Sequence, residues 1–510
     1  TTGGTLNLND NVTAAKDIQQ FGGAVNVGGS DASRTVSADN GDVLFSSAIT
    51  SSKPFTINAG AGGSGAKGKI TINNGINSNS NAIVLNGTDW DFTASGLGSI
   101  NANTSSVTIA HSTNGTINLV ASGTGLGTDD LARITTAATG TLYVGDSAKG
   151  DTVNVGGNVD FAVSTPNAEI RAASLTNTAG KLGLQNVASH LLTISTTNGA
   201  KTDLFGNIGN ANVAAHNSGT GNIALNVTSG TLNVTRSGPA GAGTGTAIDN
   251  AGGGVDLAVQ AGTLTIATSG GGVLASGNIV ARSHDALTIN DAVNSSSGNI
   301  KLVAGRASGM STVSEGTWGG AASFRTSPIN INAPVRSGYT SLNGGIEMYS
   351  TGAITQSASL DAGIQAFHTN ALTQGKTSLI TFNDTAQVGT ITVENNKTST
   401  ANPGGIGNCG TPAVSGTGNC VGAITLETRR ASGLTPYAAS DIKYKSINGT
   451  TISGVGTAAD VQFVAPSQTI SSGSGNGKNV FFYATGGDIN LNVQIGNGDI
   501  NAGQTGGSLN

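Results

Sequence analysis

Paired carboxylates are the residues of this sequence whose spacing could do chemistry on a sugar. A glycoside hydrolase places two carboxyl groups beside the scissile bond, one as the acid and one as the base or nucleophile. Asp129 and Asp130 are the one adjacent carboxylate pair in the chain. Polysaccharide-acting enzymes built on parallel strands also carry a Gly-His-Gly and an Arg-x-Lys motif downstream, and neither follows here. The pair is therefore predicted to form a turn or a cap.

A second carboxylate arrangement surrounds one of the two tryptophans. Asp89 and Asp91 flank Trp90 in the stretch TDWDF. On a strand, both carboxylates would share one face and the indole would lie on the other. These three residues are candidates for a carbohydrate contact, in which the indole stacks on a sugar. A plain solvent-facing strand is the alternative.

One segment nearly spells a phosphate-binding loop. Residues 63–70 read GSGAKGKI, with Gly63, Gly68 and Lys69 in the expected places. Such a loop needs Ser or Thr after the lysine to hold magnesium, and a helix must follow. Ile70 stands there instead and opens the alternating run ITINNGI. We interpret the match as a coincidence in a glycine-rich chain.

Metal and nucleophile patterns are lacking. The five histidines, His111, His190, His216, His284 and His368, are scattered singly and have no His or Cys neighbour at ligand spacing. Neither cysteine has a nearby histidine that would activate it. We expect no catalytic residue, no metal and no cofactor, and we predict that the chain is not an enzyme.

The amino-acid composition indicates which kind of secondary structure positions these residues. Glycine supplies 79 of 510 residues, and charged residues make up only 10%, against about 25% in ordinary proteins. A formal net charge of −5 gives no basis for binding nucleic acid, which needs clustered Lys and Arg. No apolar run approaches the roughly 18 residues that span a bilayer. Val, Ile and Thr recur throughout, which favours many short strands joined by tight turns.

A short pattern of glycine followed by apolar/polar alternation returns along the whole chain. Alternation over four to six residues is typical of a strand with one buried face. Frequent Asn-Gly turns leave an antiparallel meander open locally. The weak self-similarity at about 20 residues instead favours a β-solenoid. The clearest pair of repeats begins at Gly277 and Gly298; others read GTLNLND, GTINLVA, GNIALNV, GTLTIAT, GAITLET and GDINLNV.

The solenoid is predicted to run over residues 1–510 as one continuous rod, with no separate domain. In such a fold, like residues stack as ladders, with Val, Ile and Leu on the walls and Ala, Ser, Thr or Asn at the bends. Two stretches break the rhythm and are expected to leave the rod as loops: one near 304–328, which contains Trp318, and one near 402–420. Trp318 joins Trp90 as a candidate carbohydrate contact. No helix is expected, and residues 436–446 read as a loop.

The repeated texture resembles filamentous-haemagglutinin-like exoproteins of the two-partner secretion pathway. Ser283–Gly305 and Gly41–Gly60 resemble that family most. The resemblance implies a right-handed parallel β-helix, secretion through an outer-membrane transporter partner and a place on the bacterial cell surface or outside the cell. It also implies an adhesin, a biofilm-matrix fibre or a carrier of toxin domains. The family's NPNGI-like secretion motif has its nearest match at Asn402–Ile406, far from the N-terminus, so we expect no secretion domain here.

Three functions remain open at this stage. The first is a secreted structural adhesin whose many weak contacts with a host surface or a matrix polysaccharide add avidity. The second is a polysaccharide-acting enzyme, which a cleft lined by several carboxylates would favour. The third is a filament subunit that associates end to end, because neither end of the sequence carries a recognisable polar cap.

Cys409 and Cys420 are the two cysteines of the chain, and both follow Gly-Asn. Some adhesins of the resembling family carry a similarly close pair. In a secreted protein such a pair favours a disulfide. Closing a loop of about ten residues would contribute about 2–3 kcal/mol in the chain-entropy model. Two unpaired thiols are the alternative.

We predict that Cys409 and Cys420 are bonded to each other in protein secreted into an oxidising medium. Digestion without reductant should yield one linked peptide by mass spectrometry, and that peptide should separate into two after reduction. Two alkylated thiols in freshly secreted protein would contradict both the bridge and the extracellular location.

Overall fold

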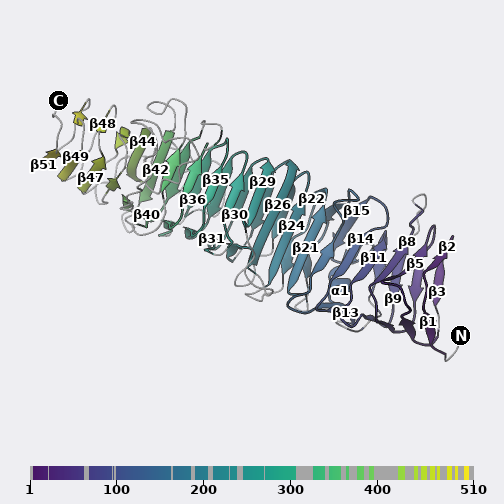
Figure 1. Ribbon diagram of the computed structural model, residues 1–510. Coiled ribbons are helices and arrows are strands. Elements are labelled where there is room, and N and C mark those ends of the chain that lie inside the picture. The colour runs from purple at the N-terminus through teal and green to yellow at the C-terminus, as the bar shows by residue number, and fades with distance from the viewer. Residues whose placement is uncertain are drawn as a thin grey trace. The chain divides into compact units, whose positions relative to one another are not determined.

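Figure 1 shows the computed structural model of the chain. It describes residues 4–394 and, beyond them, strands between 423 and 504. Gaps within 4–394 fall at 21, 63–67, 93, 95, 97–98, 162–164, 185–189, 205–210, 229, 238–244, 269, 306–325, 339, 341–343, 358–362, 367–375 and 384–389. The chain divides into two compact units: the first comprises Thr1–Thr228 and Thr235–Ala247, and the second comprises Ser229–Val234 and Ile248–Asn510.

The described residues form an almost pure β-structure. They contain strands β1 to β51 and one helix of four residues, α1 (Thr128–Leu131). The described strand pairings in each unit are parallel. The prediction of a nearly helix-free parallel structure is therefore confirmed, and the antiparallel meander is wrong. Residues 442–445, expected in a loop, form strand β45.

The first unit consists of four stacks of parallel strands. Stack I contains β1 (Leu6–Leu8), β4 (Val25–Val27), β7 (Ile49–Ser51), β10 (Ile76–Asn77), β13 (Ile100–Asn103) and β17 (Ile134–Thr136). Stack II contains β2 (Val12–Ala14), β5 (Arg34–Ala38), β8 (Phe55–Ala59), β11 (Ile83–Gly87), β14 (Val107–His111), β18 (Leu142–Val144), β21 (Asn167–Ala172), β24 (Leu191–Thr196) and β26 (Ala211–Thr220). Stack III contains β3 (Ile18–Gln20), β6 (Val43–Phe45), β9 (Lys69–Ile72) and β12 (Asp89–Asp91). Stack IV contains β15 (Thr116–Val120), β16 (Leu126–Gly127), β19 (Thr152–Val155), β20 (Val159–Phe161), β22 (Ser174–Asn177), β23 (Leu182–Leu184), β25 (Ala200–Leu204) and β27 (Ile223–Val227).

The second unit consists of three stacks of the same kind. Stack V contains β28 (Leu232–Val234), β31 (Leu264–Ile266), β34 (Leu287–Ile289), β37 (Ile329–Ile331), β40 (Ile354–Gln356), β43 (Ile391–Glu394), β45 (Ile442–Lys445), β47 (Asp460–Ala465), β49 (Asn479–Ala484) and β51 (Asp499–Gln504). Stack VI contains β29 (Ile248–Gly252), β32 (Val273–Ala275), β35 (Val293–Ser295), β38 (Val335–Ser337) and β41 (Ile364–Ala366). Stack VII contains β30 (Val255–Val259), β33 (Ile279–Ser283), β36 (Ile300–Ala304), β39 (Ile346–Ser350), β42 (Lys376–Asn383), β44 (Ala423–Arg430), β46 (Thr450–Val455), β48 (Gln468–Ile470) and β50 (Ile489–Leu491).

The chain visits the stacks in rotation, so a strand pairs with the strand one coil later and not with its neighbour in sequence. Over the first coils, β1 pairs with β4, β2 with β5 and β3 with β6. The repeats at Gly277 and Gly298 follow this rule, because Ile279 of β33 is the register partner of Ile300 of β36. β36 ends at Ala304, and the next strand, β37, begins only at Ile329. Ile329 nevertheless pairs with Leu287 of the preceding coil. The stretch predicted to leave the rod near 304–328 therefore adds length between two paired coils, and its residues 306–325 lie outside the described part.

Aliphatic ladders fill the interior because each coil repeats the inward positions of the one before it. Leu6, Val25, Ile49, Ile76, Ile100 and Ile134 follow one another in register along stack I. Stack V does the same with Leu232, Leu264, Leu287, Ile329, Ile354 and Ile391. Nearly all these side chains are fully buried. Such ladders stabilise the fold through apolar burial, at about 25 cal/mol per Å².

Serines close the bends, as the sequence predicts. Ser283, Ser295 and Ser337 end their strands and are 0% exposed. The Ser295 hydroxyl donates to the carbonyl of Gly277 at 2.8 Å, and that of Ser337 donates to the carbonyl of Gly298 at 2.7 Å. Each hydroxyl thus bonds to a carbonyl of the preceding coil, which the bend shields partly or fully from water.

Glycine is required where coils approach at a corner. Gly262 has a φ of +141°, and a methyl group there would lie 1.9 Å from the carbonyl oxygen of Gly230. Gly145 has a φ of +88°, and the same methyl group would lie 2.3 Å from the carbonyl oxygen of Arg171. Neither corner has room for a Cβ atom, which explains why a glycine precedes so many of the strands.

Buried charge is rare in the described interior, and where it occurs it is bonded. Arg34 is 1% exposed at an inward position of β5. Its Nη1 donates to Asp31 Oδ2 at 2.8 Å and to the carbonyl of Ser33 at 2.9 Å. Its Nε and Nη2 are buried and have no hydrogen-bond partner among the described residues. The ion pair with Asp31 therefore offsets only part of the cost of burying this charge.

The expected alternation fails on the outer side of stack VII. Val303, Tyr349 and Ile380 are register partners at outward positions, yet each is 0% exposed. They form one apolar cluster with Phe382, whose ring centroid lies 6.4 Å from that of Tyr349. Apolar packing therefore continues on the outer side of this stack, where simple alternation predicts side chains exposed to solvent.

We predict that Ile57→Ala destabilises the protein much more than Thr56→Ala. Ile57 is 0% exposed between Val36 and Leu85 in the ladder of stack II, so its truncation leaves a cavity. The expected loss is about 2–5 kcal/mol for Ile57→Ala and under about 1 kcal/mol for the outward Thr56. Urea unfolding followed by circular dichroism measures both; equal losses would contradict the inward and outward assignment.

Candidate functional site

A group of carboxylates lies on the outer side of stack III, around Lys69. Asp89 and Asp91 belong to β12, which pairs with β9 so that Lys69 faces Asp89 and Thr71 faces Asp91. The Lys69 ammonium lies 2.8 Å from Asp91 Oδ2. That hydrogen bond is the largest cause of the raised pKa of Lys69, and burial opposes it. The sequence did not point to Lys69 as a partner of this pair, because the two coils are joined only by strand register.

Trp90 lies on the opposite side of the same strand, as the strand period requires. Its side chain is 3% exposed, and its Nε1 donates to the carbonyl of Leu85 at 3.3 Å. The indole is therefore part of the core. The expectation that it stacks on a sugar is wrong for this residue, because a ring must be exposed to do so. A carbohydrate contact through Asp89 and Asp91, which lie on the outer side, stays a prediction.

Asp130 organises the short helix that follows this group. Its Oδ1 accepts the N–H of Phe92 at 2.8 Å, and its Oδ2 accepts the N–H of Gly127 at 3.1 Å. Burial raises the pKa of Asp130, and the charges of Asp91 and Asp89 add to this effect, while the two N–H groups oppose it. The predicted capping role is confirmed for Asp130, which is 5% exposed, whereas Asp129 beside it is exposed.

These carboxylates do not form an acid and base pair open to a substrate. Both oxygens of Asp130 are bonded to backbone, and Asp91 is paired with Lys69. Asp89 Oδ1 accepts the N–H of Gly125 at 2.9 Å. Hydrolysis of a glycosidic bond needs one protonated and one ionised carboxyl group on either side of the sugar. The arrangement around Lys69 instead fixes the connection that leads into α1.

The segment that resembles a phosphate-binding loop, residues 63–70, leads into a strand and not into a helix. Lys69 opens β9, and its ammonium is paired with Asp91. Residues 63–67 lie outside the described part. The described geometry after Lys69 offers no helix N-terminus to a phosphate, in agreement with the interpretation of the motif as a coincidence.

The histidines in the described part stay apart from one another. His284 Nδ1 lies 2.8 Å from Asp285 Oδ1, and burial lowers the pKa of His111 and of His190. Among the residues that the structure describes, no three His, Cys, Asp or Glu side chains are grouped to hold a metal ion. The described part likewise has no helix long and apolar enough to cross a membrane. Cys409, Cys420, Trp318 and His368 lie outside the described residues.

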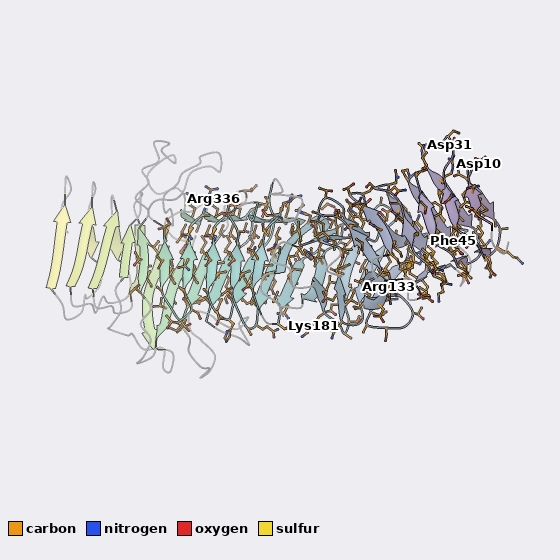
Figure 2. The ribbon with its side chains drawn as sticks, turned by 90° about the horizontal axis from the view of Figure 1, so that it is seen from below. Asp10, Asp31, Phe45, Arg133, Lys181 and Arg336 are labelled. Carbon is orange, nitrogen blue, oxygen red and sulfur yellow. The ribbon has the colours of Figure 1, made fainter. Side chains whose placement is uncertain are left out.

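The outward positions of two stacks carry uncharged polar ladders. The first ladder, on stack I, consists of Asn7, Asn26, Thr50, Asn77, Asn101 and Thr135, which are successive register partners. The second ladder, on stack V, consists of Asn233, Thr265, Thr288, Asn330, Thr355 and Thr392. Both lie on the same strands as the aliphatic ladders described above, on the outward face, one residue further along the chain. Figure 2 shows the described side chains as sticks on the ribbon.

Other outward surfaces carry charge. On stack II, the Arg171 guanidinium lies 3.5 Å from the centroid of the Tyr143 ring, and its Nε lies 3.0 Å from Glu169 Oε1. On stack VII, Arg282 pairs with Asp256. On stack VI, Arg336, labelled in Figure 2, donates through Nε to Gln365 Oε1 at 2.9 Å. Shorter uncharged runs also occur on stack II, at Ser37, Asn58 and Asn86, and on stack IV, at Asn118, Asn154 and Thr176. The ladders on stacks I and V are the longer runs, of six residues each.

Comparison with known proteins gives no relative from which a role could be transferred. No family model, no curated protein and no solved structure matches the chain. The functional argument therefore depends on the pairing of the coils and on the side chains that this pairing places together.

Asp160 of β20 gives a prediction about pH. Burial raises its pKa to about 6, and its Oδ1 has no hydrogen-bond partner among the described residues. A carboxyl group whose pKa is higher in the folded protein stabilises folding below its unfolded pKa. That contribution is lost as pH rises from about 4 to about 6.

We predict that Asp160→Asn is more stable than the native protein above pH 7, by about 1 kcal/mol after allowing for partial contact with solvent. At pH 4 the two proteins should have the same stability, because the native carboxyl group is then neutral in the fold. Thermal unfolding at several pH values measures the difference. Asp129→Asn, at an exposed position, is the control; an advantage for Asp160→Asn that is independent of pH would contradict the assignment.

Proposed function

We propose that the chain is a structural adhesin or matrix fibre of the filamentous-haemagglutinin-like type, built as a right-handed parallel β-helix and secreted to the cell surface. The observation that carries this proposal is the repeated register of the coils. In each unit, over six successive coils of one stack, an apolar residue faces inward and a polar residue faces outward at the same place. Such a fold provides stiffness and repetition, which are the properties that a contact fibre needs.

The mechanism is mechanical and multivalent. Each outward position recurs once per coil, at about 4.8 Å, the spacing of hydrogen-bonded strands. Successive coils therefore offer the same chemical group many times along one wall. Weak contacts of this kind add up when they are held on one rigid support, because the later contacts form at high effective concentration.

The described carboxylates support the fibre over the enzyme. A polysaccharide-acting enzyme would be favoured by a cleft with several carboxylates directed at one point. The closest group, Asp89, Asp91 and Asp130, is engaged by Lys69 and by backbone N–H groups. The two uncharged ladders are instead what a continuous contact surface would show.

End-to-end self-association is a second candidate, favoured by a cavity beside β1, β2 and β3. Leu6 and Val12 there are 39% and 36% exposed. The cavity has a volume of about 310 Å³ and is lined by Leu8, Ile18, Phe45 and others. Exposed apolar side chains around a cavity are a surface on which a second copy of the chain can pack. Light scattering over a range of concentrations tests this candidate, which requires a particle mass that rises with concentration.

We predict that the purified protein appears as stiff rods in negative-stain images and that beads coated with it adhere to bacterial biofilm. Adhesion should rise more steeply than linearly with the number of molecules per bead, because the contacts are multivalent. Beads coated with urea-unfolded protein at the same density are the control. Globular particles, or adhesion that survives unfolding, would contradict the proposal.

A further inference from the structure

The first ladder belongs to a wall that offers hydrogen-bonding groups without charge. Its first four members, Asn7, Asn26, Thr50 and Asn77, are exposed. The residues that precede its strands in the second to fifth coils are Ala24, Ala48, Gly75 and Ser99. In the sixth coil the residue at the same position, immediately before β17, is charged: it is Arg133, which is labelled in Figure 2.

The corners of stack I fix the orientation of two of the ladder amides. Asn77 Oδ1 accepts the N–H of Asn79 at 3.2 Å, and Asn101 Oδ1 accepts the N–H of Asn103 at 2.8 Å. Asn79 and Asn103 have φ values of 49° and 51°, the left-handed backbone that brings their N–H groups back to the ladder. With their oxygens held in this way, the amide nitrogens of Asn77 and Asn101 have no protein partner among the described residues.

The ladder therefore presents donors in a fixed direction. An amide nitrogen carries two N–H groups, and a threonine hydroxyl both donates and accepts. Within the ladder, the described bond is a long one, from Asn26 Nδ2 to Asn7 Oδ1 at 3.4 Å. Fixed donors lose less conformational entropy on binding than mobile ones, so a ligand rich in oxygen atoms gains from this arrangement.

Charge and strand pairing narrow the class of ligand. An acidic polymer would find no cation in the first five coils of this wall, and the chain as a whole has a net charge of −5. A peptide adding as an extra strand would need unpaired backbone, but β4, β7, β10 and β13 are each paired on both sides. A neutral polymer with many hydroxyl and ether oxygens satisfies both conditions.

We propose that the first ladder and the small residues beside it bind a neutral polysaccharide that lies along the direction in which the coils stack. This inference rests on the proposed function and names the contact surface and the class of ligand. The sugar hydroxyl and ring oxygens accept from the ladder amides, and the threonine hydroxyls bond to sugar hydroxyls. Because the groups recur coil after coil, affinity increases with the length of the polymer.

Native gels that contain a polysaccharide test the proposal through the retardation of the protein. Galactomannan and dextran are the neutral probes, alginate is the acidic one, and a gel without polysaccharide gives the reference mobility. The native protein should be retarded by at least one neutral polymer and not by alginate. In the double variant Asn26→Glu with Thr50→Glu, the retardation relative to the reference gel should be at least tenfold smaller than in the native protein. The reason is that the variant places two carboxylates in the ladder.

The matched control is Thr35→Glu with Thr56→Glu. These two residues are outward register partners on adjacent coils of stack II, as Asn26 and Thr50 are on stack I. Both variants therefore carry the same added charge and the same repulsion between coils. The control should keep the native retardation. Circular dichroism checks folding, and if the glutamates unfold the first variant, Asn26→Ala with Thr50→Ala takes its place with an expected loss of at least threefold.

Several results would overturn the proposal. Equal retardation of the ladder variant and the control would place binding elsewhere, and retardation by alginate alone would contradict a neutral ligand. Loss of self-association in the ladder variant, without polysaccharide binding by the native protein, would assign the wall to a second copy of the chain. If coated beads adhere to biofilm but no neutral polymer retards the protein, this inference fails and the proposed fibre stands. If neither occurs, both fail.

Discussion

The in-register parallel pairing of successive coils is the constraint on which the rest of the structure depends. In the described strands, backbone N–H and C=O groups pair with the coil before or after, so a residue is fixed above its counterpart one coil earlier. Burial then selects like on like: Ile49, Ile76 and Ile100 follow one another inside stack I. The same constraint brings coils into close contact at the bends, where Gly262 has no room for a Cβ and Ser295 bonds to a carbonyl of the preceding coil.

The same register acts on the outer side of stack I, where the first four ladder residues are exposed and burial does not select the residue type. It places Asn7, Asn26 and Thr50 in a line although they are far apart in sequence. An outward group thereby becomes a repeated group, and a weak contact becomes part of a long one. This is the physical link between the fold and the proposed role as a contact fibre, and it needs neither a cleft nor a catalytic group.

Several carboxylates in the described part of the chain bond to its own backbone. Asp130 accepts N–H groups at the start of α1, and Asp151, which is 0% exposed, accepts the N–H groups of His111 and Asp146. Where a loop interrupts the ladder, N–H groups lose their partners in the adjacent coil, and a buried aspartate supplies a substitute. The pKa of Asp151 is raised, because burial disfavours the ionised carboxylate more than the two hydrogen bonds favour it.

The sequence by itself determined the local structure, because alternation and glycine corners are local properties. It indicated parallel coils, the repeat from Gly277 to Gly298, the serine bends and the capping aspartate beside Asp129. It did not determine which side of a strand is solvent: Trp90 and Tyr349 lie buried, because their surroundings come from other coils. Nor did it show the pair of Lys69 with Asp91 or the two polar ladders. Coils of unequal length hide those relations in the sequence, and only the register of the folded walls brings the residues together.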